Sequence, residues 1–384
     1  MCAQSQSSKK NRNYDFAVLS TLAMVFVVMG HTGVGFATLD WLFPYDSFHM
    51  PLFVFISGYF FETTQVNLHN TWSFIFKQIK RLIIPFFLWN FIYGIVSLIF
   101  YFSLGVTWCH PDKFWYRLLL RPFTVGNGFF EFNAPSWFIL MLFEVKILNW
   151  FFRLILQRLR YRECVITIFY FLLAGGGIIC SRNLPRVAML ITITRAIYML
   201  FWLQAGTVYK LVLEKHDTLP SVLYFGILLM LQSLIWIICR KNGIMAFVYN
   251  SEFTNGPILT LLTAFTGIAF WLRVSKILSS SIGNSKLVTY ISTHTFSIMM
   301  HQFLGFTLLN LLLWQIDSIL GLNHFDKQAF CIDMYYKYFQ SSLTNLKFLY
   351  VIFGFLVPLS GCWIWEHIFC GNFLKRKTSR VFKH

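Results

Sequence analysis

The feature that most constrains this chain is a series of apolar runs, most of them long enough to form a helix across a lipid bilayer. A helix needs about 20 apolar residues to span the hydrocarbon core. Such runs, separated by polar connections, occur at 15–37, 48–62, 82–104, 136–152, 164–180, 187–209, 219–239, 257–272, 287–314 and 346–370. We therefore predict an all-α, polytopic integral membrane protein with about ten transmembrane helices.

Composition supports this class of protein. Hydrophobic residues make up 57% of the chain and charged residues only 12%, whereas a soluble domain has about 25% charged residues. The polar leader 1–14 is followed at once by a full-length apolar run, which predicts an uncleaved first span rather than a signal peptide. The cysteines show no metal-ligand spacing, so no metal is implied.

The net charge of +17 is distributed along the chain, because Lys and Arg separate the apolar runs instead of forming one basic stripe. This pattern argues against nucleic acid as a partner. With ten spans, the segments on the side of the N-terminus carry about twice as many Lys and Arg as the opposite loops, which places both termini in the cytoplasm. We predict one membrane domain over 1–384, with a basic cytoplasmic tail at 371–384.

Ionisable residues inside membrane spans are rare, and each is a candidate for function. Here they are His31, His49, Glu144, Lys146, Arg195, His294, His301 and, near a span end, Glu366.

The two histidines of the stretch "MGHTGVGFATLDWLFPYDSFHMPLF" are the first candidates for catalysis. At 1.5 Å per residue, His31 lies roughly 25 Å along the first helix from Tyr14, near the predicted outer side. His49 starts the next span after a short connection, so the two side chains are expected to be neighbours. An imidazole there could take a proton from a hydroxyl near neutral pH. Alternatively, each histidine is a structural residue that bonds a carbonyl of a neighbouring helix.

A basic cluster lies at the start of the third span, where Lys77, Lys80 and Arg81 precede "LIIPFFLWN". Such a cluster can hold phosphates, and arginine does so with two parallel hydrogen bonds. Anchoring of the helix at the cytoplasmic face is the alternative. Glu144 and Lys146 could simply neutralise other buried charges, whereas Arg195 lies deeper and needs a partner or a ligand.

Two predicted outer loops, 105–135 and 315–345, are unusually long and rich in aromatic residues. Loops of this length are uncommon unless they are functional or disordered. Aromatic faces with polar neighbours suit carbohydrate, but Trp and Tyr are also typical of the membrane interface.

Several stretches together resemble one family, the acyltransferase-3 proteins, which are integral-membrane enzymes that acylate cell-surface polysaccharides. The similar segments follow the family's order along nearly the whole chain. They are "VVMGHT", "FHMPLFVFISGYFF", "KRLIIPFFLW", "PSWFILMLF", "RAIYMLFWLQAG" and "TFSIMMHQF".

The resemblance implies acetyl-CoA or another acyl-CoA as donor, bound from the cytoplasm, and a sugar hydroxyl of a cell-surface polysaccharide or lipid-linked saccharide as acceptor. It also implies a bacterial cytoplasmic membrane, with membrane lipid as a partner. By position, His31 matches the family's catalytic histidine and Arg81 a basic residue associated with the donor. Trp137, Arg195 and His301 match other motif positions.

One departure from the family pattern concerns the first span. The family usually carries Arg or Lys eleven positions before the histidine and often an acid three residues earlier, but these positions are Ser20 and Ala17 here. Ser20 cannot supply positive charge. Either another cation, such as Arg81 or Arg195, compensates, or activity is lost or changed.

The sequence thus predicts a membrane O-acyltransferase in which His31 is a general base or a transient acyl carrier. Three alternatives remain open. A transporter or flippase of lipid-linked saccharides would be expected to show repeats or paired broken helices. A polysaccharide polymerase would be expected to show arginine-rich outer loops. A family member that has lost catalysis is favoured by Ser20 and Ala17.

Overall fold

The computed structural model describes residues 13–32, 42–124, 129–156, 158–159, 162–239, 243–338 and 346–370. These residues are almost entirely helical, apart from one short antiparallel pair in which Ala246 faces Phe253 and Phe247 faces Glu252. The chain divides into two compact units, one formed by 1–34 and 275–384 and the other by 35–274. The division falls within one helix, α10 (Pro257–Ile282).

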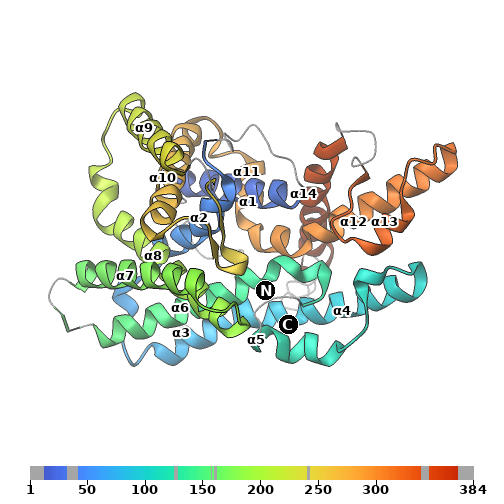
Figure 1. Ribbon diagram of the computed structural model, residues 1–384, viewed down its shortest axis with the longest axis horizontal. Helices are drawn as coiled ribbons and strands as arrows, with labels where there is room; N and C mark the ends of the chain where they lie inside the picture. Colours follow the sequence, from blue (N-terminus) through green and yellow to red (C-terminus); the bar gives the residue numbers. More distant parts are fainter. Residues whose placement is uncertain are drawn as a thin grey trace, which may run out of the picture. The chain divides into compact units, whose positions relative to one another are not determined.

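The unit that contains both ends of the chain is built on three long helices and two short ones. They are α1 (Tyr14–Thr32), α11 (Lys286–Thr293), α12 (Thr295–Leu320), α13 (Lys327–Ile332) and α14 (Lys347–Ile364), which continues as a π-helical turn, η11 (Trp365–Cys370). α1 packs against α11, α12 and α14, and α12 lies beside α14 (Figure 1). A Cβ atom on Gly305 would collide with the backbone carbonyl of Phe353, so the missing side chain is what lets α12 and α14 approach so closely.

The second unit contains the remaining elements. Its α-helices are α2 (Tyr45–Tyr59), α3 (Thr71–Gln78), α4 (Ile84–Leu104), α5 (Arg121–Thr124), α6 (Trp137–Ile155), α7 (Arg162–Asn183), α8 (Ala188–Val208) and α9 (Ser221–Cys239). Its shorter elements are η1 (Thr63–Gln65), η2 (Ile79–Ile83), η3 (Thr107–Cys109), η4 (Tyr116–Leu120), η5 (Glu131–Ser136), η6 (Tyr209–Leu213), η7 (Glu214–His216), β1 (Ala246–Phe247), η8 (Val248–Asn250) and β2 (Glu252–Phe253).

α8 is the centre of this second unit, because it packs against α2, α6 and α7. Two glycines bring α2 and α8 together. A Cβ on Gly58 of α2 would collide with the carbonyl of Leu203, and a Cβ on Gly206 of α8 would collide with the carbonyl of Phe55. The hydroxyl of Thr207 donates to the Gly58 carbonyl at 3.0 Å.

Eight of the described helical segments are long and apolar enough to cross a membrane: Tyr14–Thr32, Thr71–Leu104, Arg162–Asn183, Ala188–His216, Ser221–Cys239, Pro257–Ile282, Thr295–Leu320 and Lys347–Ile368. The prediction of an all-α, polytopic membrane protein is therefore confirmed. The other two predicted spans are also helical. However, α2 has only 15 residues, and α6 carries Glu144, Lys146 and Arg153 within its 19 residues.

Two helix boundaries differ from the prediction. The third span is part of a continuous helical segment that begins at Thr71 rather than at residue 82, so the basic cluster lies inside it. The run 287–314 is broken at His294, which ends α11 and precedes α12. The Nε2 atom of His294 lies 3.1 Å from the carboxylate atom Oε1 of Glu366.

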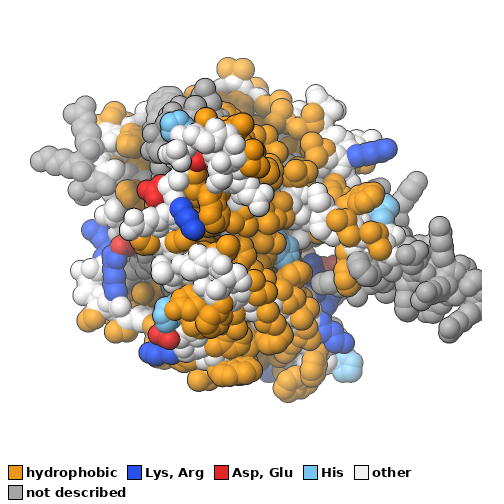
Figure 2. Space-filling model, turned by 90° about the vertical axis from the view of Figure 1, so that its right-hand side faces the viewer, with side chains coloured by type: hydrophobic (Ala, Val, Ile, Leu, Met, Phe, Trp, Pro, Cys, Tyr) orange, Lys and Arg blue, Asp and Glu red, His pale blue; other side chains and the backbone are white. Residues whose placement is uncertain are grey.

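Large apolar side chains are exposed along the outward faces of the long helices. On α4 they recur every three or four residues, at Leu88, Phe91, Ile95, Ile99 and Phe102. Figure 2 shows a face covered mostly by hydrophobic side chains, with few charged ones. Such a surface is unfavourable in water and suits contact with lipid chains.

Candidate active site

His31 lies in the last turn of α1 and is half-buried. Its Nδ1 atom is 3.1 Å from Oε1 of Gln302, a fully buried residue of α12. The imidazole also packs against the ring of Phe303, with 5.2 Å between ring centroids. A side chain bonded on one side and packed on another has little freedom to rotate, so His31 is held in one orientation.

The hydrogen bonds of Gln302 decide which nitrogen of His31 carries the proton. Nε2 of Gln302 donates to the carbonyl of Met299 at 3.1 Å, which turns the amide oxygen toward His31. That oxygen can only accept, so Nδ1 of His31 is the donor; the tautomer is assigned from the network. Nε2 then holds the lone pair, and no other described residue hydrogen-bonds to it. This is the arrangement of an oriented general base.

Gln302 is not among the candidates predicted from the sequence, although a glutamine within the apolar run "TFSIMMHQFLGF" is itself a signal. The predicted candidate is the preceding residue, His301, which is half-buried on the same helix. Of these two, Gln302 is the residue that the structure joins to His31 by a hydrogen bond. A role for His301 stays a prediction.

The first span carries no cation at the position where the family usually has one. The hydroxyl of Ser20 donates to the carbonyl of Phe16 at 2.7 Å, and Ala17 is buried. Arg81 and Arg195, the cations expected to compensate, belong to the other unit, so their compensation stays a prediction. Within the unit of His31, the cation whose charge acts on it is Lys337.

His49 lies in the first turns of α2 and makes a local contact. Its Nδ1 donates to the carbonyl of Tyr45, one turn earlier on the same helix, at 2.6 Å, whereas a structural histidine was expected to bond a carbonyl of a neighbouring helix. His49 belongs to the unit formed by 35–274, and residues 33–41 lie outside the described residues. Its adjacency to His31 and its role in catalysis therefore stay predictions.

The basic cluster has a fourth member, Lys146, beside the three residues predicted from the sequence. The charges of Lys77 on α3 and Arg81 on η2 both act on Lys146 of α6. Lys77, Lys80 and Arg81 are exposed, and Lys146 is half-buried. No hydrogen bond or ion pair to another described residue engages any of the four.

Packing between α3 and α6 explains why these cations meet. The rings of Phe74 and Trp150 are stacked at 4.1 Å, and Nε1 of Trp150 donates to the hydroxyl of Thr71 at 3.0 Å. Lys146 lies one turn before Trp150 on α6. Lys77 and Arg81 lie roughly one to two turns after Phe74 on the helical segment that begins with α3. The two helices therefore run antiparallel and bring like charges together.

Arg81 itself lies in a distorted turn. Pro85 has no N–H to donate to the carbonyl of Arg81, four residues earlier. The helix widens into the π-helical turn η2 (Ile79–Ile83), which ends two residues before this proline. Such turns are common at functional sites because they change the direction of side chains on a helix.

Trp137, Glu144 and Arg195 come together between α6 and α8. Arg195 is fully buried and its guanidinium lies 4.9 Å from the centroid of the Trp137 ring. Nη1 donates to the carbonyl of Tyr249 at 3.4 Å, while Nε and Nη2 have no partner among the described residues. The charge of Glu144 acts on Arg195, but the two form no ion pair. The predicted candidates Trp137, Glu144 and Arg195 thus meet, whereas the candidate His301 belongs to the other unit.

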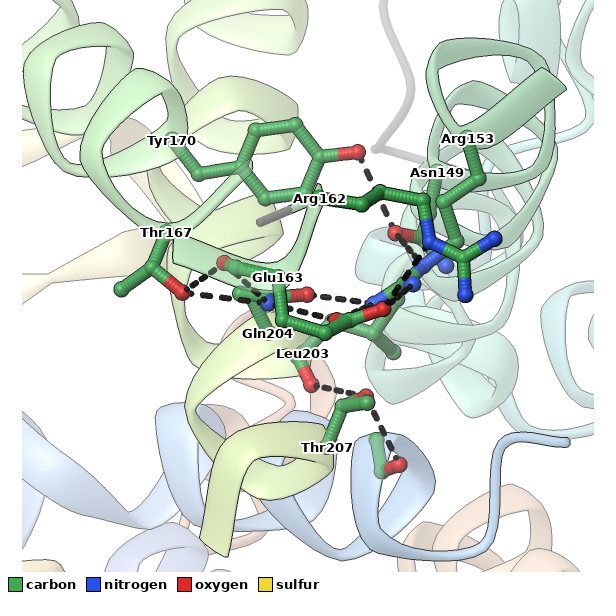
Figure 3. A network of polar contacts seen from close by, with 10 residues as sticks. Asn149, Arg153, Arg162, Glu163, Thr167, Tyr170, Leu203, Gln204 and Thr207 are labelled. Atoms are coloured by element: carbon green, nitrogen blue, oxygen red, sulfur yellow. Dashed lines mark hydrogen bonds and ion pairs between the residues drawn. The ribbon is translucent and has the colours of Figure 1, made fainter. Parts of the chain in front are cut away.

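Arg153 of α6 is a buried structural residue. Figure 3 shows its guanidinium bonded to both carboxylate oxygens of Glu163, at 2.8 and 3.0 Å, and to Oε1 of Gln204 at 2.6 Å. Nε donates to Asn149, which also accepts from Tyr170. The network joins α7 to α6, which carries Lys146, and to α8, which carries Arg195.

The long loop after α4 is organised by Arg117. This buried guanidinium donates to the carbonyls of Phe129 and His110 and pairs with Glu131. It also lies 4.9 Å from the centroid of the Phe130 ring. The loop carries exposed aromatic side chains, which include Phe123 at 71% and Trp115 at 66% exposure.

A family model described as an acyltransferase domain, of the acyltransferase-3 type, matches residues 13–367. Because the match covers nearly the whole chain, the protein belongs to this family of membrane acyltransferases. No curated protein and no solved structure matches the chain.

Proposed function

We propose that the protein transfers an acetyl or other short acyl group from acyl-CoA to a sugar hydroxyl of a cell-surface polysaccharide or its lipid-linked precursor. The observation that carries the proposal is the His31–Gln302 pair, because it presents an imidazole lone pair at Nε2 in a chain of the acyltransferase family. Catalysis is therefore supported despite Ser20. A bacterial cytoplasmic membrane is the proposed location.

In this reaction, His31 acts on the acceptor. Nε2 takes the proton of the sugar hydroxyl as the hydroxyl oxygen attacks the thioester carbonyl carbon. The tetrahedral intermediate then breaks its carbon–sulfur bond, and the departing thiolate of CoA receives the proton from His31. General base catalysis of this kind contributes about 10²- to 10⁴-fold to a rate.

The proposed donor site is the cluster of Lys77, Lys80, Arg81 and Lys146. None of the described residues places a carboxylate in an ion pair with this cluster. Its like charges repel one another, and the cost is offset when an anion binds between them. The phosphates of CoA are such an anion, and Arg81 can bind them with two parallel hydrogen bonds. The exposure of Lys77 and Arg81 leaves their charged groups accessible to a ligand.

Two features of the second unit suit the acceptor. Arg195 and Glu144 have buried polar atoms that find no partner among the described residues. A sugar hydroxyl can both accept from a guanidinium and donate to a carboxylate. The exposed ring of Trp115 offers an apolar face of the kind on which sugar rings pack.

The test is transfer of radiolabelled acetyl from acetyl-CoA to the glycans of membranes that contain the protein. We expect transfer by the wild type and a loss of about 10²-fold or more in His31→Ala with the protein still folded. His294→Ala is the matched control, because this histidine pairs with Glu366. Equal transfer by wild type and His31→Ala would refute the role of His31, and no transfer by the wild type would favour a member that has lost catalysis.

A further inference from the structure

A buried amine lies in the connection between α13 and α14. Lys337 is only 2% exposed, although it stands in the polar stretch "DMYYKY". Removing an ammonium group from water is costly unless other groups replace its hydration. Its surroundings therefore show what compensates the charge.

Aromatic faces and one carbonyl surround the ammonium. Nζ donates to the carbonyl of Tyr335 at 3.2 Å. It also lies 5.1 Å from the ring centroid of Phe306 on α12 and 5.5 Å from that of Tyr350 on α14. Cation–π contacts of this kind hold a charge without neutralising it.

No carboxylate pairs with Lys337 among the described residues. Asp333 attracts the ammonium electrostatically but forms no ion pair with it. Asp317 instead accepts a hydrogen bond from the hydroxyl of Tyr338 at 3.0 Å. One hydrogen bond uses one of the three N–H groups of the ammonium. Within the part of the chain that the structure describes, the positive charge and two donors are thus available to a further ligand.

The same cluster of rings contains His31. Phe303 packs on the imidazole and also on Phe306, with 5.5 Å between the centroids of the two phenyl rings, and on Tyr335 at 5.8 Å. The charge of Lys337 acts on His31. All of these residues belong to the same unit.

We propose that the ammonium of Lys337 stabilises the negative charge that forms beside His31 during acyl transfer. This inference rests on the proposed function. As Nε2 of His31 takes the hydroxyl proton and the carbon–oxygen bond forms, charge moves to the former carbonyl oxygen of the acyl group. Lys337 donates to that oxygen. When the carbon–sulfur bond breaks, the carbonyl re-forms and the ammonium keeps all its protons.

The proposal requires Lys337 to be charged, which gives it a pH dependence. Burial lowers the pKa of Lys337 to about 8, and Asp333 opposes the shift. The other titratable groups around it are His31 of α1, Asp317 of α12, Tyr350 of α14, and Tyr335, Tyr336 and Tyr338 of its own segment. Burial raises the pKa of Tyr336 and Tyr338, so these two stay neutral near pH 8.

The test uses three variants of the full chain in the acetyl-transfer assay. Lys337→Met keeps the apolar stem without the charge, and Lys337→Arg keeps the charge. Lys327→Met is the control, because Lys327 is an exposed lysine of α13 that lies over Trp314. Loss of a single oxyanion donor costs about 10²- to 10³-fold in kcat. We expect such a loss in Lys337→Met with KM for acetyl-CoA unchanged, and partial rescue in Lys337→Arg.

The pH profile separates this role from a structural one. The wild-type kcat should fall as the pH rises through about 8, because Lys337 loses its proton, and Lys337→Arg should remain active above that pH. A wild-type kcat without this fall, or an unchanged kcat in Lys337→Met, would overturn the proposal. If the wild type and Lys327→Met transfer no acetyl, the proposed function fails and this inference falls with it.

Discussion

Gln302 accepts a hydrogen bond from Nδ1 of His31, and its own amide nitrogen is engaged by the carbonyl of Met299. The glutamine therefore fixes both the orientation and the tautomer of the imidazole. Its effect on the reaction would be exerted through His31, which makes it a positioning residue.

Replacing Gln302 tests this role. In Gln302→Leu, the acceptor is lost, and we expect kcat to fall about 10- to 100-fold, within the total contribution of a general base. Gln302→Glu keeps an oxygen acceptor for Nδ1 and should retain more activity than the leucine variant. Steady-state acetyl transfer with acetyl-CoA measures both. Equal losses in the two variants would show that residue 302 acts by packing alone.

Lys146 is expected to bind the phosphates of the donor. Lys146→Ala should raise KM for acetyl-CoA, whereas the reaction with acetyl-pantetheine, which lacks the nucleotide and its phosphates, should change little. Lys215→Ala is a matched control, since Lys215 is an exposed lysine of η7 in the same unit. A similar rise in KM for both donors would argue against a contact with phosphate.

The ion pair between Arg153 and Glu163 should be important for stability. Glu163→Gln removes the charge partner of a guanidinium that is 1% exposed, and breaking a buried pair in this way costs about 3–5 kcal/mol. The midpoint of thermal unfolding in detergent should fall clearly. Glu252→Gln breaks an exposed pair with Arg186 and should cost no more than about 1 kcal/mol. Equal shifts would contradict the structural role.

The contact between α2 and α8 predicts a strong effect of one methyl group. In Gly206→Ala, the new Cβ meets the carbonyl of Phe55, and the helices must separate at a cost of about 1–3 kcal/mol. Gly226→Ala on α9 is the control, because its Cβ meets no other atom within 4 Å. There, alanine should be neutral or stabilising by up to about 1 kcal/mol. Unfolding midpoints in detergent distinguish the two outcomes.

The sequence was sufficient for the class of fold, because lipid imposes a strong constraint on a chain. Every backbone polar group must be satisfied within the membrane, so long apolar runs become helices. The runs around Tyr14–Thr32 and Lys347–Ile364 needed no tertiary information. His31 could also be selected from the sequence, since an ionisable residue at the end of an apolar span is unusual.

The tertiary structure alone decided which residues act together. Gln302 and Lys337 lie about 270 and 300 positions beyond His31 in the chain, and Lys146 meets Arg81 only because α3 and α6 pack antiparallel. Hydropathy depends on the free energy of transferring each residue from water to lipid, so it can be calculated from the local sequence. Hydrogen bonds and charge–charge interactions depend on distance in space, and that distance is set only when the helices pack.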